Sequence, residues 1–229
     1  MLAIALKEFK DLFKSVKSII IILFILSITF LVANLSSKYN VQLSSMGSPD
    51  NIHSAGLMIV LYIFFPFFIS SLSHNTVNQE VSSRTIRFLA TKTSRNNIIV
   101  GKFIGVMLFW FICSLIANLL ILPFSQVFYT RDFIESLIFI SYFVSFTLLM
   151  STLFNKPSTT MFLGIVASFY FSIIGIWGLF SDKLVIDILS KITPYFYFSQ
   201  DNLYSIYIIL SFTVIFLFIS LNVMRRKEL

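Results

Sequence analysis

Six long apolar runs, separated by polar segments, dominate the sequence. Each run has at least 18 residues, enough for a helix to cross the hydrocarbon core of a bilayer, which is about 30 Å thick. Backbone N–H and C=O groups inside a membrane need partners within the chain, and a helix supplies them. The pattern therefore predicts an all-α integral membrane protein in which a single domain, residues 1–229, has six transmembrane helices. The expected spans are 18–35, 56–73, 98–122, 134–153, 159–180 and 203–224.

Residues 1–17 have a different pattern, in which apolar and basic positions each recur with helical spacing. Lys7, Lys10, Lys14 and Lys17 follow one another at three or four residues, and an apolar stripe does the same on another face. A basic amphipathic helix of this kind is typical of a membrane surface, where its lysines meet anionic headgroups. The alternative is a solvated basic flank that only orients the first span. The stripe, which favours the interfacial helix, consists of Leu2, Leu6, Phe9, Phe13, Val16 and Ile20.

The polar loop between the second and third spans, residues 75–97, is too long and too patterned for a simple connector. Thr76 and Gln79 have the spacing of a capping box, which predicts a helix from Thr76 to Leu89. Glu80, Arg84 and Arg87 would then lie along one side of that helix. The alternative is an ordinary positively charged loop. The apolar anchors of the helix would be Ile86, Phe88 and Leu89.

Three local signals concern the spans themselves. Ser94, three residues before Asn97, predicts the start of the helix that leads into the third span. Pro66 lies inside the second span, where we expect a kink and a freed carbonyl that a neighbour or a local adjustment satisfies. Pro123 is expected to close the third span.

The fifth span carries small residues, Gly164, Ser168 and Ser172, at every fourth position. Small side chains let membrane helices approach closely. The stripe indicates packing within the chain, with a contact to a second subunit as the alternative.

Residues 181–202 form the most patterned loop on the other side of the membrane. An apolar helical segment ends at Pro194, and the aromatic run Tyr195 to Phe198 follows. Aromatic rings with a polar edge favour the headgroup level. The segment therefore predicts a short outer helical hairpin that dips into the outer leaflet.

The distribution of basic residues predicts the orientation. Thirteen of the 17 Lys and Arg residues lie in the two terminal segments, in residues 75–102 and at Lys156, all on one side of the predicted spans. Basic residues concentrate on the cytoplasmic side of membrane proteins. We therefore expect a multi-pass protein of the bacterial plasma membrane with both termini in the cytoplasm. We attribute the net charge of +7 to topology and to contact with the lipid bilayer. Nothing in the sequence indicates a nucleic-acid-binding surface.

Several classes of chemistry are missing from the sequence. The cores of the predicted spans carry no acidic, basic or histidine side chain of the kind that an ion-coupled carrier needs. His53 and His74 lie in loops on opposite sides, Cys113 is the single cysteine, and Gly101-Lys102 lacks the flanking residues of a phosphate-binding loop. We expect neither an enzyme nor a metal or cofactor site, so that any ATP and Mg would be bound by a partner subunit.

The loop also carries a pattern of residues that resembles a known family. Glu80, Arg84-Thr85, Leu89, Ser94-Arg95 and Gly101-Lys102 follow one another in the order found in permease subunits of type 2 ATP-binding-cassette (ABC) exporters. The chain departs from the family pattern at Arg84, where a Gly often precedes the Thr, and at Thr93, where a Pro often precedes the Ser-Arg pair. The resemblance extends over the surface helix, the six spans and the outer hairpin.

This resemblance implies a permease that works with a second permease, identical or similar, and with ABC ATPase subunits. The helix expected at 76–89 would dock on the ATPase through Glu80, Arg84 and Arg87, and Thr85, Leu89, Ser94 and Arg95 belong to the same coupling loop. Lys7, Lys10 and Lys14 would make secondary contacts with the ATPase or with lipid. An apolar, aromatic path suits an amphipathic or hydrophobic cargo such as a peptide or a lipid-like molecule. The alternatives are a non-transporting immunity or sensor protein whose basic loop binds a regulatory partner, and a cargo-capturing subunit of a vitamin importer.

Overall fold

The computed structural model describes residues 1–38, 53–181, 183–200 and 203–227, and every regular element in these ranges is a helix. Six helices are long and apolar enough to cross a membrane. The prediction of an all-α fold with six transmembrane helices is therefore confirmed. These helices are α2 (Val16–Lys38), α4 (Ala55–Ser73), α7 (Arg95–Ser125), α8 (Thr130–Leu153), α9 (Pro157–Gly178) and α12 (Leu203–Arg226).

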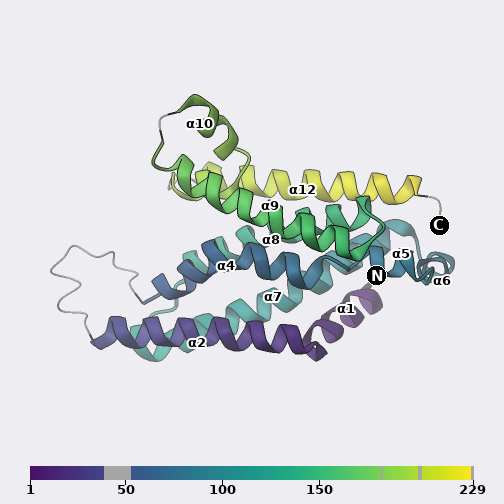
Figure 1. Ribbon diagram of the computed structural model, residues 1–229. Coiled ribbons are helices and arrows are strands. Elements are labelled where there is room, and N and C mark those ends of the chain that lie inside the picture. Colours follow the sequence, from purple (N-terminus) through teal and green to yellow (C-terminus); the bar gives the residue numbers. More distant parts are fainter. Residues whose placement is uncertain (39–52, 182, 201–202, 228–229) are drawn as a thin grey trace.

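The described residues also form five shorter helices, which lie at the two ends of the bundle. The long helices run side by side, and α1 (Leu2–Lys14), α5 (Asn78–Ser82) and α6 (Ile86–Lys92) gather at one end with the end of α12 (Figure 1). Helices α10 (Leu184–Ser190) and α11 (Pro194–Phe198) follow α9, and α10 lies at the opposite end (Figure 1). The start of α1 and the end of α12 therefore lie on the same side, as an even number of spans requires.

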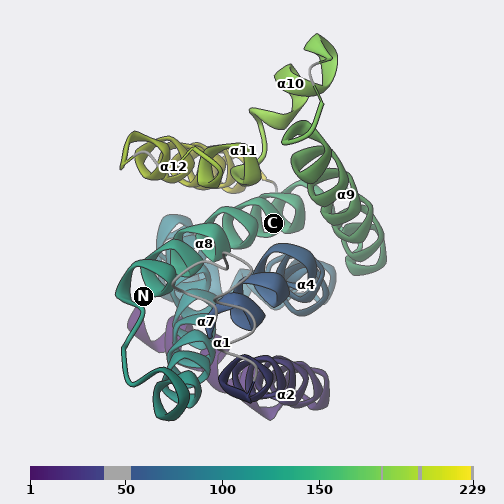
Figure 2. The same cartoon turned by 90° about the vertical axis from the view of Figure 1, so that its left-hand side faces the viewer.

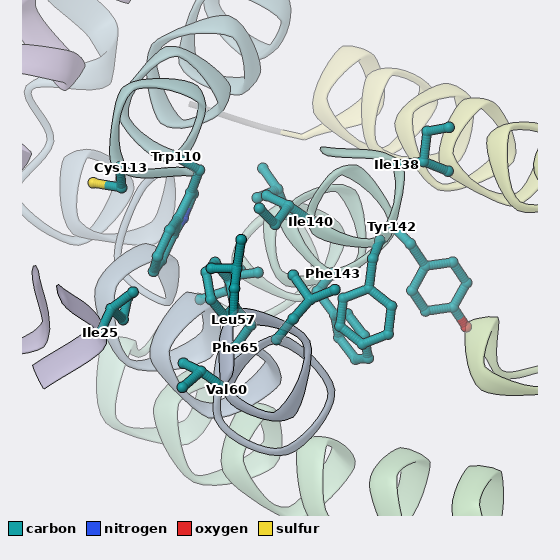
Figure 3. Packing of buried hydrophobic residues seen from close by; sticks show 14 of the residues in the cluster. Ile25, Leu57, Val60, Phe65, Trp110, Cys113, Ile138, Ile140, Tyr142 and Phe143 are labelled. Carbon is teal, nitrogen blue, oxygen red and sulfur yellow. The ribbon is translucent and has the colours of Figure 1, made fainter. Parts of the chain in front are cut away.

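Helix α8 occupies the centre of the bundle and contacts α4, α7, α9 and α12 (Figure 2). Its residues from Ile138 to Leu149 are all buried, because neighbouring helices cover every face. Beside it, the rings of Phe65 on α4 and Trp110 on α7 pack 4.9 Å apart (Figure 3). Helices α2, α9 and α12 expose much more of their apolar surface, as helices that face lipid do.

Helix α7 does not stop at Pro123, where we expected its end. It continues to Ser125 and ends at Gln126, whose backbone is left-handed with φ 56°. A proline removes one helical hydrogen bond, and this loss is tolerated near the end of a membrane helix.

Pro66 is accommodated by a neighbouring side chain. Since a proline has no N–H, the carbonyl of Tyr62 four residues earlier loses its helical partner. The hydroxyl of Tyr195 on α11 donates to this carbonyl and also lies 2.9 Å from the hydroxyl of Ser172 on α9. Helix α11 is thus bonded to the second and fifth spans.

The small residues of α9 pack within the chain, as predicted. The hydroxyl of Ser168 lies 2.9 Å from that of Ser70 on α4. A Cβ at Gly164 would lie only 3.2 Å from the Cβ of Ser70, so the two helices meet where their side chains are smallest.

Candidate functional site

The loop after the second span contains two short helices, so the prediction of one continuous helix from Thr76 to Leu89 is wrong. The break falls at Ser83, Arg84 and Thr85, and Arg84 has φ 60°. The hydroxyl of Ser83 donates to the carbonyl of Gln79 at 2.8 Å, a local bond that competes with helix continuation. Glu80 therefore lies on α5 while Arg87 lies on α6, and the two do not share one helical side.

The predicted capping box is also absent. The hydroxyl of Thr76 donates instead to the carbonyl of Ser73 at the end of α4, at 2.6 Å. The side chain of Gln79 accepts from the amide of Asn75 at 2.7 Å. The second start signal is correct, because the hydroxyl of Ser94 accepts from the backbone N–H of Asn97 at the start of α7.

An ionic cluster lies behind the loop and consists of Lys7, Glu8, Glu80 and Lys102. Lys102 is only 1 % exposed, and its ammonium lies 3.2 Å from Glu8 and 3.1 Å from Glu80. Lys7 adds a longer pair, 3.5 Å from Glu80. Burial raises the pKa of the Glu8 carboxyl, and the attraction of Lys102 opposes that rise. Because a buried ammonium needs compensating charges, these pairs hold α1, α5 and α7 together.

Two glycines of α7 let α1 approach Lys102. A Cβ at Gly105 would lie 2.6 Å from the carbonyl oxygen of Ala5 and 2.8 Å from the Cβ of Glu8. At Gly101 it would lie 3.0 Å from the carbonyl oxygen of Met1. The two glycines, one turn apart, thus allow α1 to pack directly against α7. This close packing places Glu8 beside the buried ammonium of Lys102.

The start of α5 is bonded to two further spans. The hydroxyl of Ser151 on α8 accepts from the backbone N–H groups of Val77 and Asn78, at 3.0 and 3.2 Å. The side-chain amide of Asn78 donates to the hydroxyl of Thr160 on α9 at 2.7 Å. Val77 and Asn78 belong to the loop, whereas Ser151 and Thr160 belong to spans. A shift of α5 would therefore break hydrogen bonds to α8 and α9.

Arg95 joins the end of the loop to the last span. Its guanidinium donates to the carbonyls of Met224, Arg225 and Lys227, at 3.2, 2.9 and 2.8 Å. These carbonyls lie at the end of α12, where a helix has no partners of its own for them. Arg95 therefore caps α12 from within the chain.

The remaining residues of the loop form an exposed surface at the end of the bundle. Arg84, Arg87 and Phe88, which we call the α6 surface, are exposed, and Phe88 is exposed to 76 %. Thr85 and Ser94 are also exposed, and Leu89 is half-buried. Ile86 points the other way, into a small cluster that consists of Val77, Ile99, Leu148 and Met224. On α1, Lys7, Lys10 and Lys14 are exposed.

The residues described contain no group of three His, Cys, Asp or Glu side chains that could hold a metal ion. His53 and His74 flank opposite ends of α4. The site therefore consists of ion pairs, caps and an exposed basic surface.

The family of the chain is known from a comparison with protein-family models. The model described as "ABC-2 family transporter protein" matches residues 2–228. The chain belongs to the ABC-2 transporter family. A search of curated proteins found no match. The resemblance to an ABC-2 permease is thus confirmed over nearly the whole chain, and the six apolar helices fit the membrane component of such a transporter.

In this ABC-2 permease, several residues of the site were not singled out from the sequence. Glu8, Asn78, Ser151 and Thr160 are polar residues in segments rich in similar ones, and nothing in their spacing indicates partners so distant in the chain. Lys102 did carry a signal, since it is a lone charge at the start of an apolar run. A charge in such a position requires a partner, and the acids before it in the chain are the candidates.

Proposed function

We propose that the chain is the permease subunit of an ATP-driven exporter and that a separate ATPase engages it at the α6 surface. One observation carries the proposal. The α6 surface lies exposed at the end of the bundle, while the residues around it are bonded to four different spans. An element with one free face and a fixed base is suited to pass a movement of a partner to the spans.

The path of that movement runs through packed and hydrogen-bonded groups. Ile86 lies under the α6 surface and contacts the cluster that includes Ile99 of α7, Leu148 of α8 and Met224 of α12. A displacement of α6 therefore acts on three spans at once, because a close-packed cluster has little free volume.

The chemistry of the α6 surface fits an acidic groove on the ATPase. Arg84 and Arg87 can pair with carboxylates, and Phe88 can fill an apolar pocket between them. Thr85, Leu89 and Ser94 lie beside this surface and make secondary contacts. Glu80 and Arg95 act inside the permease instead, Glu80 by holding Lys102 and Arg95 by capping α12.

The basic end of the molecule also indicates its orientation in the membrane. The end that carries α1, α5, α6 and the end of α12 faces the cytoplasm of a bacterial cell, where an ATPase and its ATP and Mg are found. Helix α1 lies along the inner surface of the membrane, with Lys10 and Lys14 directed to headgroups or to the ATPase. The exposed side chains of Leu2 and Leu6 support this placement, because they are free to contact lipid, while Phe9 and Phe13 of the same stripe pack against the core of the bundle.

The cargo is an amphipathic or hydrophobic molecule that passes between two permeases, identical or similar. The described spans support this class of cargo, because their centres present apolar and aromatic side chains and the buried Lys102 is already paired. A small ion would need fixed charges or polar ligands along its path.

Co-purification with the ATPase encoded in the adjacent reading frame tests the proposal. We expect the wild-type permease to retain a stoichiometric ATPase in detergent, and the double variant Arg87→Ala with Phe88→Ala to lose at least ten-fold in affinity. Lys156→Ala with Phe162→Ala is the matched control, since it removes an exposed lysine and an exposed phenylalanine elsewhere. If the wild type retains no ATPase, the exporter is excluded and a sensor or immunity protein becomes the better assignment.

A further inference from the structure

A polar cavity of about 540 Å³ lies between the bend from α1 to α2, the end of α4 and helix α5. This volume falls in the range of cavities that bind small molecules. The cavity is distinct from the α6 surface, because Arg84, Arg87 and Phe88 do not line it. Ser15 to Lys17, where α2 begins, form one of its walls. The end of α4 forms another, through Ser71, Leu72, His74 and Asn75.

The position of these walls fixes the depth of the cavity in the membrane. Helices α2 and α4 both cross the bilayer, and each contributes its terminal residues to the cavity. The ends of transmembrane helices lie at the level of the lipid headgroups. Leu12, Val16 and Leu72 add an apolar edge to the otherwise polar lining, and Val16 is 70 % exposed.

The charges on the cavity wall are only partly compensated within the chain. Lys7, Glu8, Glu80 and Lys102 line one side and neutralise one another in the ionic cluster. Asp11 and Lys17 also line the cavity, and neither forms an ion pair within the described part of the chain. His74 lies on the same wall as the end of α4, and its Nδ1 is 2.8 Å from the carbonyl oxygen of Ser71. The cavity thus offers one cation and one anion to a ligand.

We propose that this cavity binds the headgroup of a zwitterionic phospholipid, with the phosphate near Lys17 and the ammonium near Asp11. The acyl chains leave over Leu12, Val16 and Leu72 into the hydrocarbon. Both side chains are exposed, so the selectivity comes from direct attraction: a zwitterionic headgroup brings a cation to Asp11, whereas an anionic headgroup places only negative charge beside that carboxylate. A lipid held here contacts α1, α2, α4 and α5 together and fills the space between the surface helix and the loop.

Lipid binding to the full-length chain, purified in detergent and measured by native mass spectrometry, tests the inference. We expect phosphatidylethanolamine to bind at least five-fold tighter than phosphatidylglycerol. Lys17→Ala lowers the affinity for both lipids at least ten-fold, and Asp11→Asn removes the preference for phosphatidylethanolamine. Lys156→Ala is the matched control, because it removes an exposed lysine at the start of α9 that does not line the cavity, and its affinity stays within two-fold of the wild type.

Three results would overturn the inference. The first is a Lys156→Ala variant that loses as much affinity as Lys17→Ala, which indicates diffuse attraction to the basic residues at this end of the molecule. The second is a wild type that does not distinguish the two lipids. The third is water-soluble phosphoethanolamine binding as tightly as the lipid, which assigns the cavity to a free small molecule. The measurement needs no ATPase, so its failure and that of the co-purification are separate results.

Discussion

The ammonium of Lys102 lies 3.1 Å from the carboxylate of Glu80 and joins the third span to the loop that precedes it. The two residues belong to the pattern on which the resemblance in the sequence rests, Glu80 at its start and Gly101-Lys102 at its end. The ion pair gives this pattern a physical reason. Gly101 lets α1 pack close to α7, and Lys102 then forms ion pairs with Glu8 of α1 and Glu80 of α5. The two ends of the motif therefore meet in one ionic cluster.

Loss of the buried cation should destabilise the permease strongly. Lys102→Met leaves the carboxylates of Glu8 and Glu80 close together without their common partner, and we expect a loss of about 3 kcal/mol in the free energy of unfolding. Denaturation of the purified chain in detergent measures this loss. The triple variant that adds Glu8→Gln and Glu80→Gln should recover at least half of it. If the triple variant is no more stable than Lys102→Met, the ion pairs do not hold α1 and α5.

Ser151→Ala should loosen the start of α5. The substitution leaves the backbone N–H groups of Val77 and Asn78 without an acceptor, and an unsatisfied buried donor costs about 1–3 kcal/mol. Ser145→Ala on the same helix is the control, because that hydroxyl donates only to the carbonyl of Tyr142 within α8. Hydrogen exchange should accelerate at residues 77–82 in Ser151→Ala and remain unchanged in Ser145→Ala.

Arg84→Gly should stabilise the loop. Arg84 has φ 60°, a left-handed conformation that costs a residue with a Cβ about 1–2 kcal/mol. Glycine removes that penalty but loses more entropy on folding, so the net gain is about 0.5–1 kcal/mol. Arg87→Gly removes the same charge from a helical position of α6 and should destabilise the loop by about 1 kcal/mol. Equal effects of the two variants on the exchange of loop amides would contradict a strained Arg84.

The raised pKa of Glu8 predicts a dependence of stability on pH. Burial favours the protonated carboxyl in the folded chain, so the folded state binds more protons than the unfolded state between the unfolded pKa, about 4.3, and the raised value. This contribution to stability is present at lower pH and is lost as the pH rises through the raised pKa. Glu8→Gln should remove this part of the pH dependence. Asp11→Asn, which removes an exposed carboxylate of α1 outside the ionic cluster, is the comparison variant.

The positions of the six long helices could be predicted from the sequence because each depends on a property of its own residues. An apolar run of sufficient length forms a helix in a membrane whatever its neighbours are. The start of α7 at Ser94 and the close packing of α9 on α4 are also local properties, set by one capping hydroxyl and one stripe of small residues.

The loop was predicted less well because its shape depends on distant partners. Hydroxyl groups at Ser83 and Thr85 bond to the backbone of α5, and Ser151 binds the first N–H groups of that helix, so a periodic pattern alone gave one helix where there are two. We expected Glu80 to contact a partner protein. In the structure its carboxylate forms ion pairs with Lys102 and Lys7 of the same chain. The spacing of residues along one helix does not show which charged residue of another helix will pair with them.

Arg95 also determines when this end of the molecule becomes rigid during translation. It is synthesised 129 residues before Met224, whose carbonyl it binds, and it caps two further carbonyls of the same helix end. Until the ribosome has passed Lys227, the first turn of α7 has no contact of this kind, although the spans before α12 can already be inserted. The end that carries α6 is thus completed only after the sixth span has been made.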